Sequence, residues 1–410
     1  MNTMGRFGRL FFAITLAITA GACRATVLSD AISGSSGANS GGSSSGDTGG
    51  SSSGDTGGSG GVGGGSGGAA GGGGALTCMG APSGQPCGPD AACDGAGHCL
   101  VTLASSLNFP TAIAVDAESV YWVNSDGDNG SVMKCAINGC GNAPTTLATG
   151  QPLPESIALN ATHVYWSNNG KGGFDGSVLR CAIDGCGGVP EVMTSSLLVS
   201  GVAADAAHVY ITRITPMGAS GGGLVLKCPA DGCAGNPEQI AAVDGVPQGP
   251  VVNGSTLVWS ASPVGSMQNK GAVLRCDPQG CMPVTITSGP SMDLRALTMD
   301  AVNVYSVNFD FTVMKAALDG SDAMAPVTLA SLNGNDIPNA IATDGVNVYF
   351  TVIAMGGTPS VMRCAVGGCN MKPTPVASGP MVVQPSGIAV DATSVYWTDA
   401  ATGMVMKTAK

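Results

Sequence analysis

The hydrophobic residues of this chain occur in short runs, and one pattern of runs returns seven times after residue 100. An apolar stretch, an Asp or Asn, a turn and a Tyr- and Trp-rich stretch follow one another, as in IAVDAESVYW at residues 113–122. The Asp or Asn falls at positions 116, 160, 205, 253, 300, 344 and 391, which gives steps of 44, 45, 48, 47, 44 and 47 residues. All six Tyr and all four Trp lie in this phrase. Runs of this length and composition predict β-strands.

Each repeat predicts four strands. An apolar strand precedes the Asp or Asn, the Tyr–Trp strand follows it, and a third strand such as SVMKC leads through a tight turn into a fourth such as PTTLAT. The Asn-Gly and Asp-Gly pairs at that turn are typical of hairpins. Four short strands at this period are typical of propeller blades. We therefore predict an all-β fold, a seven-bladed β-propeller of four-stranded blades over residues 100–410.

The seventh repeat contains only three of its four strands. The segment LVTLASSL at residues 100–107 matches the fourth strand of other repeats, such as APVTLASL at 325–332. We therefore predict that this N-terminal strand completes the last blade and closes the ring.

Ten of the 15 cysteines form five pairs with the same C-x4-C spacing, each at the turn between the third and fourth strands. In the fifth repeat both positions change together, to Ala316 and Ser321. Cysteines that are present or absent as pairs are expected to be bonded as pairs. The predicted hairpin disulfides join Cys135 and Cys140, Cys181 and Cys186, Cys228 and Cys233, Cys276 and Cys281, and Cys364 and Cys369.

Four more cysteines lie just before the repeats: Cys78, Cys87, Cys93 and Cys99. In an exported protein this density predicts a small two-disulfide knot over residues 77–99, and the spacing leaves its pairing open. The alternative is a zinc site that also uses His98, but the segment lacks C-x-x-C pairs.

The N-terminus carries export signals. Arg6 and Arg9 precede an apolar run that is too short to span a membrane, which predicts a signal peptide over residues 1–22. Cys23 follows Ala-Gly-Ala, is the odd cysteine of the fifteen, and resembles the lipidated cysteine of bacterial lipoproteins. We expect lipidation at Cys23 and an outer-membrane or cell-surface location, with secretion or a periplasmic location as the alternative. The Gly- and Ser-rich residues 23–76 predict a disordered tether.

The charge of the chain excludes several partners. There are 27 acidic and 16 basic residues, so the formal net charge is -11. Phosphate binding requires a basic face, which argues against nucleic acid, and a polybasic membrane patch is equally disfavoured. We expect membrane contact only through the lipid anchor, and a monomer.

Two motifs carry family resemblances. Residues Tyr396–Asp399 read YWTD, the phrase of the YWTD propellers of lipoprotein-receptor type. PSGIAVD at 385–391 and PTAIAVD at 110–116 are similar to a motif of NHL-type and streptogramin-lyase-like propellers. The tethered propeller as a whole resembles surface lipoproteins of myxobacterial type. The resemblances imply a propeller fold. The lyase-like motif also implies a His in the slot after its Pro, and none of the seven slots here holds one.

One edge of the predicted propeller carries the candidate site. Strand direction alternates, so the loops entering the inner strands and the loops after the Tyr–Trp strands share this edge. These loops vary in length, and variable loops on a rigid scaffold favour recognition. The residues predicted to line the channel mouth are Thr111, Glu155, Ser200, Gln248, Arg295, Asn339 and Ser386. A second ring is formed by Asn124, Asn168, Arg213, Asn308 and Asp399. From it, Arg213 and Asp399 are further ligand-binding candidates. Ordinary solvated channel lining is the alternative.

Other candidate residues have simpler explanations. His163 and His208 are predicted to be turn residues. Asp126 and Asp128 are spaced like part of a calcium loop but lack its distal Glu, so a hairpin loop is favoured. A Lys or Arg stands before each first cysteine position, and we expect it to pair with carboxylates of its own blade. This basic belt comprises Lys134, Arg180, Lys227, Arg275, Lys315, Arg363 and Lys407.

From these features we predict a non-catalytic binding or scaffold module for a protein or glycan, with no cofactor, no metal and no catalytic residue. The first alternative is a lyase or hydrolase with its site in the channel, in which Glu155 serves as an acid and Arg295 holds an anion. The second alternative is a structural protein of the cell envelope.

Overall fold

The computed structural model describes residues 78–171, 175–215, 222–262, 271–289, 294–321 and 326–410. The chain divides into two units, Met1–Gly74 and Ala75–Lys410, and all described residues belong to the second. The predicted signal peptide, Cys23 and the tether lie outside the described residues. Within the described part of the chain, no helix is long and apolar enough to cross a membrane.

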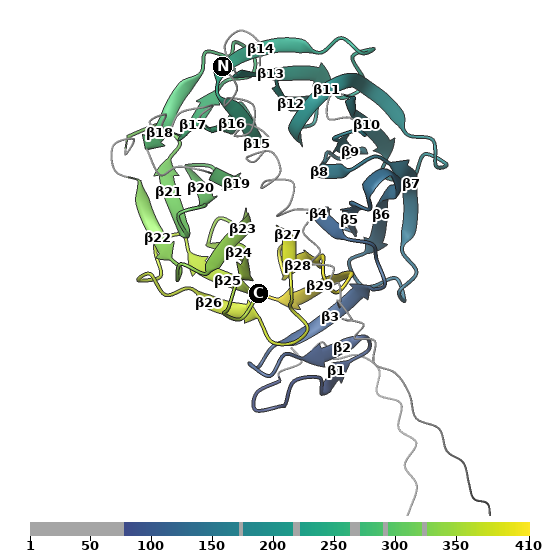
Figure 1. Cartoon of the computed structure of the whole chain (residues 1–410), viewed down its shortest axis with the longest axis vertical. Helices are drawn as coiled ribbons and strands as arrows, with labels where there is room; N and C mark the ends of the chain where they lie inside the picture. Colours follow the sequence, from purple (N-terminus) through teal and green to yellow (C-terminus); the bar gives the residue numbers. More distant parts are fainter. Residues whose placement is uncertain (1–77, 172–174, 216–221, 263–270, 290–293, 322–325) are drawn as a thin grey trace, which may run out of the picture. The chain divides into compact units, whose positions relative to one another are not determined.

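Each repeat forms an antiparallel set of strands (Figure 1). The inner strands are β4 (Pro110–Val115), β8 (Pro154–Leu159), β15 (Val246–Asn253), β19 (Leu294–Met299), β23 (Asp336–Thr343) and β27 (Pro385–Val390). The Tyr–Trp strands are β5 (Ser119–Asn124), β9 (His163–Asn168), β12 (His208–Ile214), β16 (Thr256–Ser262), β20 (Asn303–Asn308), β24 (Asn347–Ala354) and β28 (Ser394–Asp399).

The remaining strands complete these sets. The third strands are β6 (Gly130–Ala136), β10 (Gly176–Ala182), β13 (Gly222–Pro229), β17 (Gly271–Cys276), β21 (Thr312–Ala317), β25 (Ser360–Ala365) and β29 (Met404–Ala409). The outer strands are β7 (Thr145–Gln151), β14 (Glu238–Asp244), β18 (Val284–Gly289), β22 (Val327–Ser331), β26 (Thr374–Ala377) and β3 (Cys99–Ala104). The knot contributes β1 (Pro86–Gly88) and β2 (Ala91–Cys93). A short 3-10 turn, η1, spans Gly127–Asn129.

The prediction of seven separate blades requires a correction. Five sheets hold one repeat each, whereas a seven-stranded sheet from β8 to β14 holds two repeats. The strand β11 (Glu191–Ala204) joins them: its first half pairs with β10 and its second half with β12. The outer strand of one repeat thus runs without a break into the inner strand of the next, and no loop separates the two sheets.

The strands form a closed ring. Inner strands contact one another in the order β4, β8, β11, β15, β19, β23, β27 and back to β4 (Figure 1). The predicted closure is confirmed, because β3 pairs antiparallel with β29 through Val101 and Lys407, Thr102 and Met406, and Ala104 and Val405. The N-terminal strand therefore supplies the outer strand of the last repeat.

The knot extends the same sheet, since β2 pairs with β3 and β1 pairs with β2. Its disulfides join Cys78 to Cys93 and Cys87 to Cys99. Three of these sulfurs lie close together, but all four are oxidised, which corrects the zinc alternative: none is a thiolate that could bind the metal. The His98 ring Nδ1 instead lies 2.7 Å from Asp94 Oδ2.

The Tyr–Trp phrase builds the core between repeats. Neighbouring residues of a strand point to opposite faces of its sheet. Trp166 accordingly packs in one cluster with Tyr121 of the preceding repeat, and Trp122 in another with Tyr396 across the closure. All ten Tyr and Trp side chains are buried. The phrase recurs because each repeat must fill the interface on both of its sides.

Candidate binding edge

Two edges of the propeller differ in their chemistry. We call loop edge the side formed by the segments that enter the inner strands and by those that join the Tyr–Trp strands to the third strands. We call turn edge the opposite side, which carries the Asp or Asn turns and the cysteine hairpins.

The Asp residues of the turn edge are held by their own repeat. In each of Asp116, Asp205, Asp300, Asp344 and Asp391, one carboxylate oxygen accepts from backbone N–H groups of the turn and the other from the Tyr hydroxyl five residues later. We call this arrangement the Asp–Tyr pair. Burial alone would raise the pKa of Asp300, but the Tyr305 hydroxyl and two backbone N–H groups lower it overall. Burial and the adjacent carboxylate in turn raise the pKa of Tyr305.

The two histidines of the repeats directly follow the Asp or Asn turns, where they were predicted to lie, and each is the first residue of its Tyr–Trp strand. The backbone N–H of His163 donates to Asn160 Oδ1, and that of His208 donates to Asp205 Oδ1. Both therefore lie at the turn edge, remote along their strands from the loop edge.

The basic belt makes different contacts from those predicted. Five of its members donate to a backbone carbonyl in the hairpin of the next repeat. The pairs are Lys134 with Ile183, Arg180 with Ala230, Lys227 with Pro278, Lys315 with Val366, and Lys407 with Ile137. Among the described residues, the predicted pairing within one blade holds only for Arg180 with Glu191 and for Lys227 with Glu238. The third strand faces the next repeat, where a hairpin carbonyl needs a donor, so the belt joins repeats.

All five predicted hairpin disulfides are present. Four of them also lie against the outer strand of the preceding repeat. The Sγ atoms of Cys140, Cys186, Cys233 and Cys369 lie 3.4–3.6 Å from the carbonyl oxygens of Leu103, Leu147, Met193 and Leu329. The hairpins are therefore held within themselves and against a neighbouring repeat.

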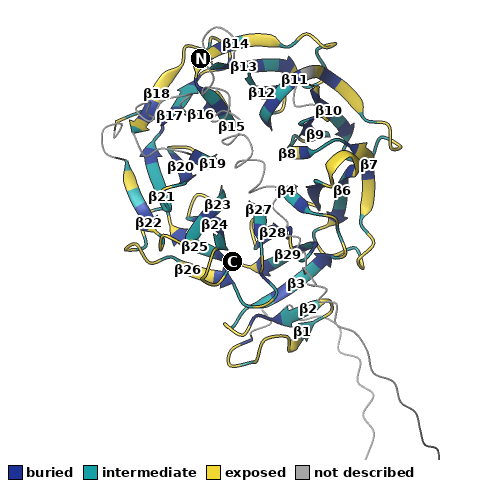
Figure 2. Cartoon of the chain, in the orientation of Figure 1, coloured by how far each residue is buried: buried dark blue, intermediate teal, exposed yellow. Residues whose placement is uncertain are grey.

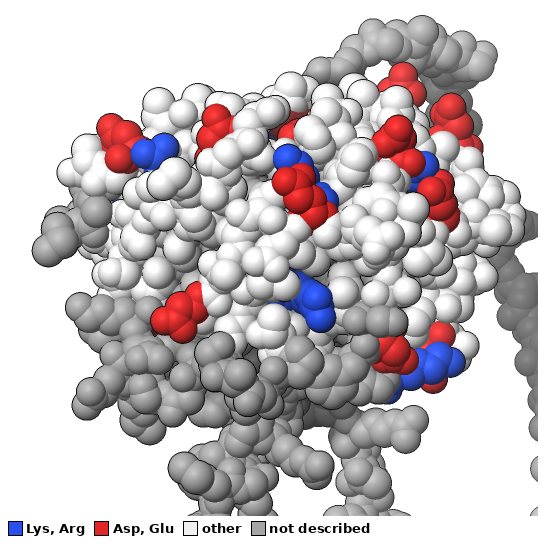
Figure 3. All heavy atoms as spheres, turned by 90° about the horizontal axis from the view of Figure 1, so that it is seen from above, with Lys and Arg blue, Asp and Glu red and all other residues white. Residues whose placement is uncertain are grey.

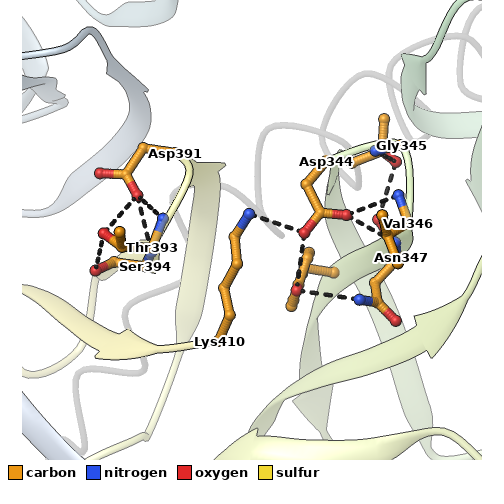
Figure 4. A network of polar contacts seen from close by, with 10 residues as sticks. Asp344, Gly345, Val346, Asn347, Asp391, Thr393, Ser394 and Lys410 are labelled. Carbon is orange, nitrogen blue, oxygen red and sulfur yellow. Dashed lines mark hydrogen bonds and ion pairs between the residues drawn. The ribbon is translucent and has the colours of Figure 1, made fainter. Parts of the chain in front are cut away.

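The turn edge also carries a depression of about 430 Å³ between Asp344 and Asp391. Lys410 reaches into it and donates to Asp344 Oδ2 over 2.8 Å (Figure 4). Burial opposes ionisation of Asp344, yet Lys410 and the N–H groups of Asn347 and Val346 hold its pKa at about 2. The polar groups of this depression are thus satisfied by the chain itself. On the face seen in Figure 3, charged groups are scattered, and some Lys and Arg groups lie beside acidic ones while others stand apart.

Several predicted channel-mouth residues join neighbouring repeats at the loop edge. Ser200 Oγ donates to the Pro247 carbonyl, and Asn339 Nδ2 donates to the Ser386 carbonyl over 3.3 Å. The carbonyl of Thr111 accepts from the Thr398 hydroxyl across the ring closure. Their ligand-binding role stays a prediction, but each already has a structural task.

Glu155 has a different environment. It is the second residue of β8, and its side chain is exposed. Surrounding protein atoms nevertheless raise the pKa of its carboxyl by reducing hydration, and the Asn169 side-chain amide, which donates to Oε2, acts in the opposite direction. Glu155 is therefore a carboxyl group that solvent reaches and that binds a proton more readily than usual.

Arg295 and Gln248 are the two remaining residues of this ring, and both are partly exposed. The Arg295 guanidinium lies over the Phe309 ring, with its carbon 4.3 Å from the ring centre. Phe309 follows the β20 strand, so a loop-edge residue orients the guanidinium. Gln248 is partly exposed in β15, and its backbone carbonyl accepts from Ser260.

The second ring is mostly buried. Asp399 has no exposed surface, and its oxygens accept from the N–H groups of Val383, Gln384 and Thr402. Asn124, Asn168 and Asn308 are also buried, and their amides donate to Ser131, Gln151 and Thr312. Only Arg213 of this ring is partly exposed. These residues hold the loops in place, and their predicted contact with a ligand is untested.

The segment with calcium-loop spacing, for which a hairpin loop was favoured, does not bring its two carboxylates together. Asp126 accepts from the Asn108 side chain, whereas Asp128 pairs with Lys171 of the next repeat at 3.5 Å. The two side chains serve separate loop contacts.

Sequence reasoning missed three residues that shape this edge. Asn169 and Phe309 each directly follow a predicted second-ring residue, and Gln151 Oε1 accepts from both Trp166 and Asn168. Gln151 ends an outer strand, where the repeat pattern gives no reason to expect contact with the next repeat. Phe309 carried a signal, since it is an aromatic residue outside the Tyr–Trp phrase.

Comparison with solved structures identifies the class of fold as a β-propeller. A catalytically inactive His-to-Ala variant of virginiamycin B lyase from Staphylococcus aureus with quinupristin has a TM-score of 0.55 at 13% identity, over 76% of this chain and 99% of that chain. The WD40 β-propeller domain of Doa1 has a TM-score of 0.52 at 9% identity, over 75% and 95%. A prolyl endopeptidase has a TM-score of 0.50 at 10% identity, over 74% of this chain and 50% of that chain.

No protein-family model matches the chain, and no curated protein matches its sequence. The structural similarities cover both binding and enzymatic propellers, and at these identities they show the fold alone. The seven disulfides among the described residues indicate an extracellular or otherwise exported protein.

Proposed function

We propose that this chain is a non-catalytic binding module whose loop edge recognises a protein or glycan. The observation that carries the proposal is the contrast between the two edges. At the turn edge, Asp–Tyr pairs, basic-belt contacts and disulfides commit most polar groups to the fold. At the loop edge, Glu155, Arg295 and Gln248 present partly or fully exposed polar side chains beside loops of unequal length.

Affinity capture from the native source tests this proposal. Partners retained by the wild-type chain should be lost, by at least tenfold in recovered amount, with a Glu155→Ala, Arg295→Ala double variant. As a control, a Glu118→Ala, Lys372→Ala double variant removes one acidic and one basic exposed residue that lie away from the loop edge. This variant should still capture the same partners as the wild type. Equal capture by all three proteins would exclude the loop edge as the recognition surface.

A second candidate function is a lyase or hydrolase that uses Glu155 as its acid. The raised pKa of this exposed carboxyl supports it, since a proton donor must be protonated near working pH. The missing His in the lyase-like slots argues against it. A turnover assay on a candidate substrate with a Glu155→Gln variant separates the two proposals, because the binding module alone predicts no turnover by either protein.

We also propose that the chain is exported and anchored by a lipid on Cys23. The disulfides support export, and the lipobox-like Ala-Gly-Ala-Cys supports the anchor. Labelling of growing cells with a fatty acid should mark the wild-type protein and leave a Cys23→Ser variant unmarked. The unlabelled Cys23→Ser variant should also appear in the soluble fraction. Labelling of both proteins would contradict lipidation at Cys23.

We infer, finally, that the seven repeats act as seven blade positions, two of which share β11. The change of partner within β11 supports this, because Leu197 is paired with β10 and the next residue, Leu198, is paired with β12. A structural role in the envelope is the remaining alternative, and it predicts that shortening the loop-edge segments leaves the cellular phenotype unchanged.

A further inference from the structure

The outer edges of the blades are not equivalent. Five of the six single outer strands, β7, β14, β18, β22 and β26, end their sheets, whereas β3 is followed by β2 and β1. The strand β2 pairs antiparallel with β3 through Ala91 and Val101, Ala92 and Leu100, and Cys93 and Cys99. The outer edge of a blade in this chain therefore accepts an added strand.

One position of the outer strand distinguishes the blades. It is the residue paired with the basic-belt member of the third strand. It is a Glu in the second and third repeats (Glu191 and Glu238, respectively) and a Thr in the first and sixth (Thr145 and Thr374). In the fourth, fifth and seventh repeats it is a Val (Val284, Val327 and Val101). Val101 is half-buried beside the knot, whereas Val284 is 51% exposed and Val327 is 46% exposed. The valine at this position is therefore partly covered in the seventh repeat but exposed to solvent in the fourth and fifth repeats.

Of these two open edges, β18 is the more accessible. The β22 edge is partly occupied, because Met371 of the next repeat forms a parallel bridge with Ala330. No charged residue lies between Pro278 and Gly289, and Met282 beside the strand is 81% exposed. Figure 2 shows exposed residues along β18. Natural edge strands usually carry charges that prevent pairing. This strand carries none, as is also true of β7, β22 and β26, and it differs from them in combining an open edge with the exposed Val284 and Met282.

The local strand geometry does not block an added strand. The ladder between β17 and β18 has a register shift at Val273 and Leu274. The corresponding ladder between β29 and β3 has the same shift at Val405 and Met406, and β2 is nevertheless added there. The shift is therefore compatible with strand addition.

We propose that the outer edge of β18 pairs antiparallel with β18 of a second copy of this chain. Antiparallel pairing of identical strands follows a twofold axis, so each side chain meets side chains of the same strand. An uncharged strand is self-complementary in this arrangement, because no like charges are placed opposite one another. The interface lies at the rim, distinct from the loop edge, and it replaces the monomer expected from sequence with a dimer that presents two loop edges.

The oligomeric state of the full-length chain tests this proposal. Sedimentation velocity across a wide concentration range should show dimers for the wild type. A Val284→Lys variant places a lysine in the paired edge strand of each copy and should weaken dimerisation at least tenfold. Thr374→Lys places a lysine at the equivalent position of the sixth repeat and should leave dimerisation unchanged.

A monomeric wild type at all concentrations would overturn the proposal, as would equal dimerisation of the two variants. Near-ultraviolet circular dichroism checks that both variants keep the native fold. If Val284→Lys does not, Met282→Lys gives the same test, because Met282 is 81% exposed and outside the ladder.

Discussion

At the scale of single residues, the Asp–Tyr pair explains the most regular feature of the sequence. The Asp closes the turn with one oxygen and receives the Tyr hydroxyl with the other, which explains why the two recur together in five repeats. In the second repeat Asn160 takes the place of the Asp, and its amide donates to the Tyr165 hydroxyl. The fourth repeat agrees with this reasoning, since Asn253 stands at the turn and Val258 replaces the Tyr. The sequence pattern revealed the residues, but the bond between them depends on strand register and became evident only in the structure.

Loss of one Tyr hydroxyl should destabilise the propeller by an amount that depends on its partner. Tyr305→Phe leaves Asp300 without its donor, and hydrogen bonds to charged groups contribute about 1.5–3 kcal/mol. Tyr165→Phe removes contacts with the neutral Asn160 amide and the Ala230 carbonyl, each of which contributes about 1 kcal/mol. Urea denaturation should therefore show the larger loss per removed hydrogen bond for Tyr305→Phe. A smaller loss per bond would contradict the proposed charge assistance.

The pair between Asp344 and Lys410 should make stability depend on acid pH. The pKa of Asp344 is about 2 in the folded state against a reference value of 3.8, so the folded state favours the ionised form. Its contribution is present above pH 4 and is lost as the pH falls towards 2, with a size of about 2 kcal/mol. Denaturation from pH 5 to pH 2 should show a flatter profile for Asp344→Asn than for the wild type. Parallel profiles would refute this role.

At the scale of elements, the strands and hairpins were largely predictable, whereas the contacts between repeats were not. The C-x4-C spacing and its joint loss at Ala316 and Ser321 predicted local disulfides, which are present. The basic belt was assigned to carboxylates of its own blade because these are near in sequence. The actual acceptors are carbonyls roughly one repeat away, as with Lys134 and Ile183, and no local pattern encodes that distance.

Removal of one hairpin disulfide should weaken the protein without preventing folding. Cys228→Ala with Cys233→Ser reproduces in the third repeat the residues that the fifth repeat carries at Ala316 and Ser321. Cross-linking so short a loop contributes about 2 kcal/mol in the chain-entropy model, so the free energy of unfolding should fall by about that amount. Urea denaturation measures this loss. Failure of the double variant to fold would show that this disulfide does more than close one hairpin.

At the scale of the whole molecule, ring closure was predictable because the missing strand and its replacement share a sequence pattern. The joining of two repeats through β11 was not, because it depends on an uninterrupted strand where other repeats have a break. The site was predictable only in part. The loop edge and Glu155 emerged from the repeat, but Asp399 is buried and bonded to backbone, which its position in the YWTD phrase did not reveal.

If β3 is an integral strand, its core residue should matter as much as its counterpart elsewhere. Leu103 is 1% exposed in β3, and Leu147 is 2% exposed at the equivalent position of β7. Leu103→Ala and Leu147→Ala should each cost about 2–5 kcal/mol by denaturation. A much smaller cost for Leu103→Ala would mean that β3 is only loosely docked and that the ring closes without it.

The division between a recognition edge and a structural edge is the central claim, and amide hydrogen exchange on the partner complex tests it most directly. Binding should slow exchange in loop-edge peptides, above all around Glu155 and Asn169 and around Arg295 and Phe309. Peptides of the turn edge, such as those around Asp205 and Asp300, should exchange as in the free protein. Protection confined to the turn edge would contradict the account.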